Sequence, residues 1–231
     1  MMFAANSILF VPGSRADRIA KALASEADLV CIDLEDAVAP PDKDSARATV
    51  IDGLAGFDRA RTAVRINGTM TRPGIKDMIA IAESAMAPAW VFVPMVEHAS
   101  EIAQVARVLD NPAIGIIPLI ETVKGLREAH RIARQPGVAA MMFGGGDFSA
   151  QLGVDLAFDP LLVARGQFIM ACADASVPAI DVPFVKLDDA AGLADECRKV
   201  RVLGFAAKAA IHPAQVPAIN TAFGADAAAI A

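Results

Sequence analysis

The feature that most constrains this chain is a regular alternation of short apolar segments with amphipathic ones. The apolar segments are rich in β-branched and other aliphatic residues, and we interpret eight of them as buried strands, at Ile8–Val11, Leu29–Asp33, Ala63–Asn67, Val91–Pro94, Ile114–Ile120, Val138–Phe143, Pro178–Ile180 and Phe205–Lys208. Near-continuous apolar strands separated by helices are typical of a parallel sheet that is covered by those helices.

Two of the intervening segments carry a clear helical period. One apolar stripe is formed by Ile102, Val105, Ala106 and Leu109, and a second by Val123, Leu126, Ala129, Ile132 and Ala133. Spacings of three and four residues place such side chains on one face of a helix. Ser14, followed by Asp17, resembles a helix N-cap with an acidic residue in the first turn, so we expect a helix after the first strand.

Eight β/α units in 231 residues favour a closed (β/α)8 TIM barrel, with an open doubly wound sheet as the structural alternative. Because there is no linker or low-complexity insert, we predict a single barrel domain over residues 1–231. The Ala-rich stretch 219–231 is weakly patterned, and we expect a short helix or a frayed tail there.

Composition excludes several classes of protein. A net charge of −6 gives no broad electrostatic footprint for nucleic acid, although single arginines can still bind small anions. Cys31, Cys172 and Cys197 lack metal-ligand spacing and indicate reduced thiols. There is no secretory signal and no apolar run long enough for a membrane span, so we expect a cytoplasmic protein that does not contact membranes.

Polar residues that could take part in catalysis or ligand binding gather at the predicted strand ends. In a barrel of this type the carboxyl ends of the strands meet at one mouth, where active sites are built. The residues that follow or end five of the strands are Arg15, Glu35 with Asp36, Arg65, Glu121 and Asp147. Four acids and two arginines are therefore expected to converge on one site.

Several carboxylates that converge on one site are best reconciled by a divalent cation, and ligation by oxygen favours Mg²⁺, with Mn²⁺ as an alternative. Mg²⁺ usually takes one or two carboxylates and keeps several waters. We therefore predict Glu121 and Asp147 as ligands, with Glu35 and Asp36 holding metal-bound waters. The arginines would receive a substrate carboxylate or an enolate oxygen as planar donors.

Structural roles are the alternative for each residue taken singly. Acids at strand ends often cap the next helix, and Arg65 can form a structural salt bridge across the mouth. The glycines of "FGGGDF" often mark a tight βα turn, and no phosphate loop follows them. The three histidines have no serine or cysteine partner in the pattern, which argues against a hydrolase triad. The prediction of a metal site depends on all six residues occurring together at the strand ends.

Seven segments of the chain resemble the citrate lyase beta-subunit family, within the metal-dependent aldolases and acyl-CoA lyases. They occur in family order from residue 7 to about 216 and read "SILFVPGSRADRIAKAL", "DLVCIDLEDAV" with "KDSAR", "VRIN", "IPLIET", "FGGGDFSAQLG", "AID" and "LGFAAKAAIHPAQV". Single motifs would be weak evidence, but seven in order over nearly the whole chain are specific.

The resemblance implies a (β/α)8 barrel, Mg²⁺, and cleavage of a short hydroxy-acyl thioester, of the citryl, citramalyl or malyl type, into an acyl thioester and a 2-oxo acid. Matched residue by residue, it implies metal ligands at Glu121 and Asp147 and water-holding acids at Glu35 and Asp36. Its substrate-binding arginines fall on Arg15 and Arg65, and Phe10 would line the pocket. Arg65, Glu35 and Asp36 are thus the predicted catalytic residues. Phe10, Arg15, Arg65 and Glu121 are the predicted substrate contacts.

Two departures from the family pattern stand out. Longer acyl-CoA lyases continue beyond "IHPAQ" into a C-terminal lid with an acid–base aspartate, and this chain ends about fifteen residues after Gln215, so we expect the lid to be absent. The family's usual glycine before the lysine of "GFxGK" is Ala207 here, which we expect to crowd a turn around Lys208.

Two rival functions remain open. Class II aldolases that act on free 4-hydroxy-2-oxo acids share the metal acids but carry a Glu-His pair after the second strand, where this chain has Glu35-Asp36. A barrel without a lid can also bind an oxo acid or a CoA thioester without catalysis. The sequence does not distinguish CoA from an acyl-carrier protein. The resemblance implies a homo-oligomer, either a trimer or a hexamer.

Overall fold

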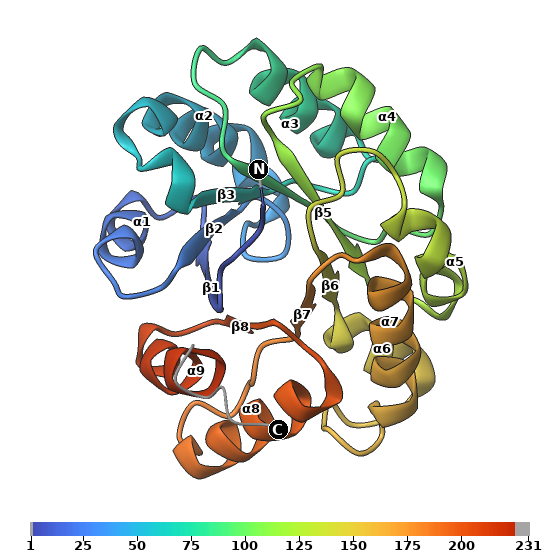
Figure 1. Ribbon diagram of the computed structural model, residues 1–231. Helices are drawn as coiled ribbons and strands as arrows, with labels where there is room; N and C mark the ends of the chain where they lie inside the picture. Colours follow the sequence, from blue (N-terminus) through green and yellow to red (C-terminus); the bar gives the residue numbers. More distant parts are fainter. Residues whose placement is uncertain (1, 225–231) are drawn as a thin grey trace.

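The computed structural model describes residues 2–224, in which eight parallel strands close into a barrel (Figure 1). Each strand pairs with the next along the chain, and the last pairs with the first. The strands are β1 (Ser7–Pro12), β2 (Leu29–Asp33), β3 (Thr62–Arg65), β4 (Trp90–Val93), β5 (Gly115–Ile120), β6 (Met141–Phe143), β7 (Ala179–Asp181) and β8 (Ala207–Ala210). The predicted (β/α)8 barrel is confirmed.

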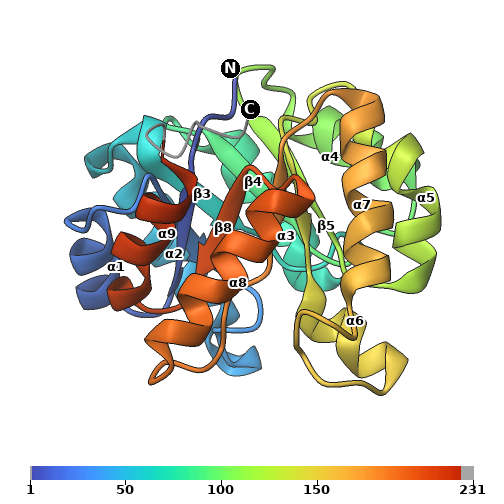
Figure 2. The same cartoon turned by 60° about the horizontal axis from the view of Figure 1, so that its bottom comes forward.

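The helices form a ring outside the strands, as both ribbon views show (Figures 1 and 2). They are α1 (Ala16–Leu23), α2 (Lys43–Gly53), α3 (Arg72–Glu83), α4 (Ala99–Leu109), α5 (Val123–Ala133), α6 (Gly145–Leu152), α7 (Leu162–Ala175), α8 (Ala190–Leu203) and α9 (Val216–Phe223). The connection from β6 to β7 carries two helices, α6 and α7. The expected short helix near the end of the chain is α9, and the expected tail over 225–231 lies outside the described residues.

The core has two layers, which explains the near-continuous apolar strands. Side chains such as Ile32, Val64 and Ile120 point outward and pack under the helices. Alternate side chains such as Cys31 and Phe92 point inward and fill the barrel. Because successive strand residues face opposite sides, both faces of every strand must be apolar. All three cysteines are buried and unpaired.

All eight predicted strands exist, but several ends differ. The sixth was predicted from Val138, yet β6 begins at Met141, because Val138 makes an isolated bridge to Ile116. The two amphipathic stripes are confirmed as α4 and α5. The expected N-cap at Ser14 is wrong: α1 begins at Ala16, and the capping position is Arg15, whose side chain makes no capping hydrogen bond.

The expectation that Ala207 crowds a turn is also wrong. Ala207 lies inside β8, opposite Ile180 of β7, where a methyl group fits in the barrel interior. The next residue, Lys208, is fully buried, and its Nζ lies 2.6 Å from Asp181 and 2.7 Å from Glu196. Arg165 of α7 holds the second Asp181 oxygen at 2.9 Å. This network of paired charges joins β7 and β8 to α7 and α8.

Candidate functional site

The second and third strands bring Asp33 and Arg65 side by side at the barrel mouth, because their ends are in register. Arg65 Nε and Nη2 donate to the two carboxylate oxygens of Asp33 at 2.7 and 2.6 Å. Asp33 also accepts the main-chain N–H groups of Glu35 and Ala37. This bidentate pair fixes the plane of the guanidinium group.

Asp33 is a site residue that the sequence interpretation left without a role. Burial opposes the charge of Arg65, but the hydrogen bonds and negative charge of Asp33 outweigh it, so the pKa of Arg65 lies above its usual value. The signal was present in the sequence, since Asp33 ends one predicted strand and Arg65 lies near the end of the next. Arg65 also lies over the Phe10 ring, 5.4 Å from its centroid, so Phe10 supports the cation from below.

Glu35 and Asp36 flank the free side of the guanidinium. Arg65 Nη1 lies 3.0 Å from Glu35 Oε2 and 3.3 Å from Asp36 Oδ2. Asp36 is exposed, whereas Glu35 is largely buried, and its Oε2 has no hydrogen-bond partner among the described residues. Burial raises the pKa of Glu35 to about 8 against the opposing charge of Arg65, and nearby acids add to the rise.

Glu121 follows β5 and is buried at the mouth. Its Oε2 accepts the main-chain N–H of Met95 at 2.6 Å, across from the end of β4. Burial raises the pKa of Glu121 to about 7, although the Met95 N–H and Arg65 favour the charged form. Asp147 contributes to the rise by repulsion. Asp147 itself lies in the first turn of α6, directly after β6, and its side chain is exposed to the mouth.

These side chains share one cavity of about 430 Å³ at the carboxyl ends of the strands. Of the predicted residues, Phe10, Asp36, Arg65, Glu121 and Asp147 line it. Glu35 lines a larger neighbouring cavity of about 870 Å³ and reaches this one through Arg65. The structure therefore brings together the residues that the sequence placed at the ends of β2, β3, β5 and β6, together with Phe10 of β1.

Arg15 is the exception. Its side chain is half-exposed and forms an ion pair with Asp17 at 2.9 Å, so it stands outside the 430 Å³ cavity. Arg18, one turn further along α1, lines that cavity instead. Arg15, Arg18 and Lys21 together line an adjoining cavity of about 460 Å³ that shares Phe10 and Pro12 with the first. Arg18 is the second site residue that sequence reasoning missed.

The donor set fits a hard divalent cation. The largely buried carboxyl group of Glu35 and the buried one of Glu121 have raised pKa values at the mouth, although the positive charge of Arg65 acts on both. All donors are carboxylate oxygens, the ligands that Mg²⁺ prefers. Residues 2–224 contain no group of three or more acidic, histidine or cysteine side chains that could form a complete protein cage. Mg²⁺ needs no such cage, since it binds through one or two carboxylates and retains waters.

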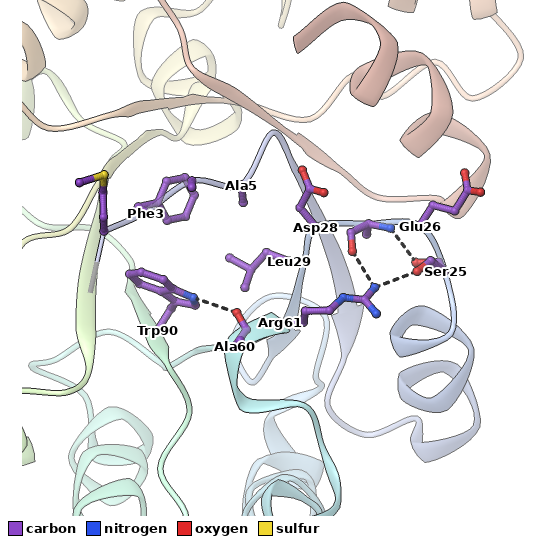
Figure 3. Close-up of a pocket in the computed structure, with 12 residues that line it drawn as sticks. Phe3, Ala5, Ser25, Glu26, Asp28, Leu29, Ala60, Arg61 and Trp90 are labelled. Carbon is purple, nitrogen blue, oxygen red and sulfur yellow. Dashed lines mark hydrogen bonds between the residues drawn. The ribbon is translucent and has the colours of Figure 1, made fainter. Parts of the chain in front are cut away.

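A separate cavity of about 530 Å³ lies at the opposite, amino-terminal end of the barrel (Figure 3). Its arginine, Arg61, donates to the main-chain oxygens of Ser25 and Ala27 at 2.8 and 2.7 Å. The Trp90 indole points toward the Ala60 carbonyl. The guanidinium of Arg61 is thus used to fix the turn after α1, and the predicted site residues lie at the other end.

Comparison with known proteins agrees with this geometry. Residues 6–213 match the family model for HpcH/HpaI aldolase/citrate lyase. The chain belongs to this family. The predicted resemblance to the citrate lyase beta subunit is thereby confirmed, because the beta subunit of Mycobacterium tuberculosis is also among the solved structures it resembles. Within the described residues, no helix of this family member is long and apolar enough to span a membrane.

Curated relatives of this HpcH/HpaI family member act on malyl-CoA. A (3S)-malyl-CoA thioesterase of Cereibacter sphaeroides is 34% identical over 94% of this chain and 76% of its own length. An L-malyl-CoA/β-methylmalyl-CoA lyase of the same species is 30% identical over 93% of this chain and 77% of its own length.

Two solved structures are similarly close. RipC from Yersinia pestis has a TM-score of 0.86 and 37% identity, covering 98% of both chains. The M. tuberculosis citrate lyase beta subunit, solved with oxaloacetate and magnesium, has a TM-score of 0.85 and 32% identity, covering 96% of this chain and 98% of the other. A relative that holds magnesium agrees with the oxygen donors found at the mouth of this barrel.

Proposed function

We propose that this chain is a Mg²⁺-dependent carbon–carbon lyase. Its substrate is a short hydroxy-acyl-CoA thioester of the citryl, citramalyl or malyl type, and its products are an acyl thioester and a 2-oxo acid. The observation that carries the proposal is that Glu121, Asp147 and Arg65 face one cavity at the barrel mouth. The malyl-CoA lyase relative and the magnesium-bound relative support it.

Glu121 and Asp147 would hold the metal ion, from the ends of β5 and β6. When bound there, Mg²⁺ supplies Lewis-acid chemistry: it lowers the pKa of the substrate hydroxyl and stabilises the 2-oxo acid as it forms. The charged form of Glu121, which burial and the nearby Asp147 and Asp36 disfavour, would be favoured beside a cation. Mn²⁺ offers the same coordination preferences and serves as a spectroscopic substitute.

Arg65 stabilises negative charge while the carbon–carbon bond breaks. The electron pair of that bond passes to the thioester fragment, which becomes an enolate. Because Asp33 fixes the guanidinium by two hydrogen bonds, Arg65 is oriented before the substrate arrives. Removal of one such preorganised donor typically lowers the rate about 10²–10³-fold.

Glu35 is the group that is best suited to carry the proton. The reaction moves one proton from the substrate hydroxyl to the carbon of the enolate, so a group that titrates near neutral pH is required. Burial places the pKa of Glu35 at about 8, and its Oε2 lies 3.0 Å from Arg65 Nη1 without a hydrogen bond to any described residue. Asp36, exposed beside it, would hold water in the site.

The CoA portion would lie along α1. Arg15, Arg18 and Lys21 line the 460 Å³ cavity that adjoins the site. Arg15 is paired with Asp17, which lines this cavity too, so Arg18 and Lys21 would be the cations that receive phosphate groups. The 870 Å³ cavity on the other side is a poorer match, because it contains Glu35, Glu97 and Glu101. Its two lysines are already engaged, Lys43 with main-chain oxygens and Lys124 with Glu97.

A panel of thioesters tests the proposal. Citryl-, citramalyl-, malyl- and β-methylmalyl-CoA are incubated with the chain, with and without Mg²⁺, and released 2-oxo acid and free thiol are both measured. We expect 2-oxo acid from at least one thioester, dependent on Mg²⁺, without release of free thiol. Asp147→Ala should abolish the reaction, whereas Asp155→Ala, an exposed acid after α6, should not change it. No 2-oxo acid from any thioester would contradict the proposal.

Thioester hydrolysis is the second candidate, since the 34% identical relative is a malyl-CoA thioesterase. In that reaction the carbon–sulfur bond breaks in place of the carbon–carbon bond. The same panel distinguishes the two, because hydrolysis releases free CoA thiol and an intact hydroxy acid. Free thiol without 2-oxo acid would assign this chain to hydrolysis.

A further inference from the structure

The turn after β4 has an unusual backbone. Met95 has φ of 55°, in the left-handed region that side chains other than glycine rarely adopt. In this conformation its main-chain N–H points at the end of β5 and donates to Glu121 Oε2 at 2.6 Å. Strained conformations of this kind persist where the surrounding structure enforces them, and they cluster at functional sites.

The residues after Met95 are anchored and enforce the turn. The N–H of Val96 donates to Leu119 O in β5. The carbonyl oxygen of Val96 packs against Gly125 of α5, where an added Cβ would lie 2.5 Å from it. Glu97 accepts from Thr122 and Lys124. With the following residues fixed on β5 and α5, Met95 absorbs the reversal of the chain.

The opposite side of Glu121 is also enclosed by backbone. Gly144 follows β6, and a Cβ at this position would lie 2.2 Å from Glu121 Cγ and 2.6 Å from Oε1. The N–H of Gly144 donates to Ile120 O, which holds the two segments together. No residue larger than glycine fits at position 144 while Glu121 keeps this orientation.

We propose that these two backbone segments clamp the Glu121 carboxylate in its metal-binding orientation, and that Met95 and Gly144 are positioning residues for it. The inference rests on the proposed function, in which Glu121 is a metal ligand. Met95 contributes through its N–H, so its side chain is dispensable for the clamp. Gly144 contributes by leaving space for the stem of Glu121.

Two substitutions at Met95 separate backbone from side chain. Glycine adopts a φ of 55° without strain and keeps the N–H, so Met95→Gly should bind Mn²⁺ within about twofold of the unchanged chain. A β-branched residue is a poor fit there, so Met95→Val should shift the N–H and weaken Mn²⁺ binding about 10–100-fold. Mn²⁺ affinity is read from the electron paramagnetic resonance signal of the free ion, beside the midpoint of thermal unfolding.

A matched pair of glycines tests the other side. Gly144→Ala should weaken Mn²⁺ binding about 10–100-fold, because the new methyl group displaces Glu121. Gly166→Ala, in α7, is the control, because a Cβ there meets no atom within 4 Å and Gly166 does not line the cavity. If Gly144→Ala does not fold, the result at Met95 decides the question.

The clamp is overturned if Met95→Val binds Mn²⁺ as tightly as the unchanged chain, or if Met95→Gly loses as much affinity as Met95→Val. The latter outcome would assign the effect to the methionine side chain. Equal affinities for Gly144→Ala and Gly166→Ala would also overturn it. If the unchanged chain does not bind Mn²⁺, the proposed function itself fails. If the unchanged chain binds Mn²⁺ but the variants behave as described above, only the clamp fails.

Discussion

At the scale of single residues, the site is a group of carboxylic acids around the guanidinium of Arg65, which Asp33 holds in place. The two groups of greatest interest are Glu35 and Glu121, because burial raises the pKa of the first to about 8 and of the second to about 7. Arg65 attracts both, but its best hydrogen bonds go to Asp33. The strand-end acids were visible in the sequence. The raised pKa values were not, since they depend on burial and on distances across the barrel.

These pKa values predict how stability depends on pH when metal is absent. Both folded pKa values lie above the ordinary carboxyl value of 4.5. The stability that these two groups contribute is therefore fully present below about pH 4.5 and is lost as the pH rises through about 7–8. The thermal midpoint in a chelator should fall over this window, and Mg²⁺ should restore it at pH 9.

The variant Glu35→Gln isolates one of the two groups. It removes a largely buried charge at pH 9. Because each unit of pKa difference corresponds to about 1.4 kcal/mol, we expect a gain of several kcal/mol in the free energy of unfolding and a higher thermal midpoint. At pH 5, where Glu35 is already neutral, the variant should show no gain. A chain whose midpoint is the same at pH 5 and pH 9 in chelator would refute the electrostatic description of the mouth.

At the scale of elements, apolar pattern predicted which strands exist, because every strand of this barrel is buried on both faces. It did not predict their ends, which depend on where the neighbouring strand stops pairing. β6 is shorter than predicted because Val138 forms only an isolated bridge, to Ile116 of β5. The start of α1 was set one residue too early, at Ser14 in place of Arg15. Arg15 was predicted because it follows the first strand and matches the family's substrate-binding arginine, whereas Arg18, one turn further along α1, carried no such signal.

The basic face of α1 predicts a defect specific to CoA. Arg18→Ala and Lys21→Ala should each raise the KM for the CoA thioester about tenfold with little change in kcat, because each removes a charged contact to phosphate. A thioester of a short pantetheine fragment, which lacks those phosphates, should show no such increase. Arg131→Ala, an exposed arginine on α5, is the control. If Arg18→Ala and Lys21→Ala have the same KM for the CoA thioester as Arg131→Ala, CoA binds elsewhere.

At the scale of the whole molecule, closure of the barrel is what converts scattered strand ends into one site. Eight regular β/α units made that closure predictable, and with it the meeting of Arg65, Glu121 and Asp147. Side-chain partners were less predictable, since Asp33 is adjacent to Arg65 in register but not in sequence. The left-handed turn at Met95 left no signal, because methionine is not a residue that marks such turns. The expected trimer or hexamer remains a prediction, to be tested by the molar mass in solution.

The most direct test of the account is anomalous diffraction from crystals of the chain grown with Mn²⁺. We predict one strong peak at the barrel mouth, with a carboxylate oxygen of Glu121 and one of Asp147 both within about 2.2 Å of it. A peak bound by other residues, or Glu121 and Asp147 turned apart with no ion between them, would contradict the central claim.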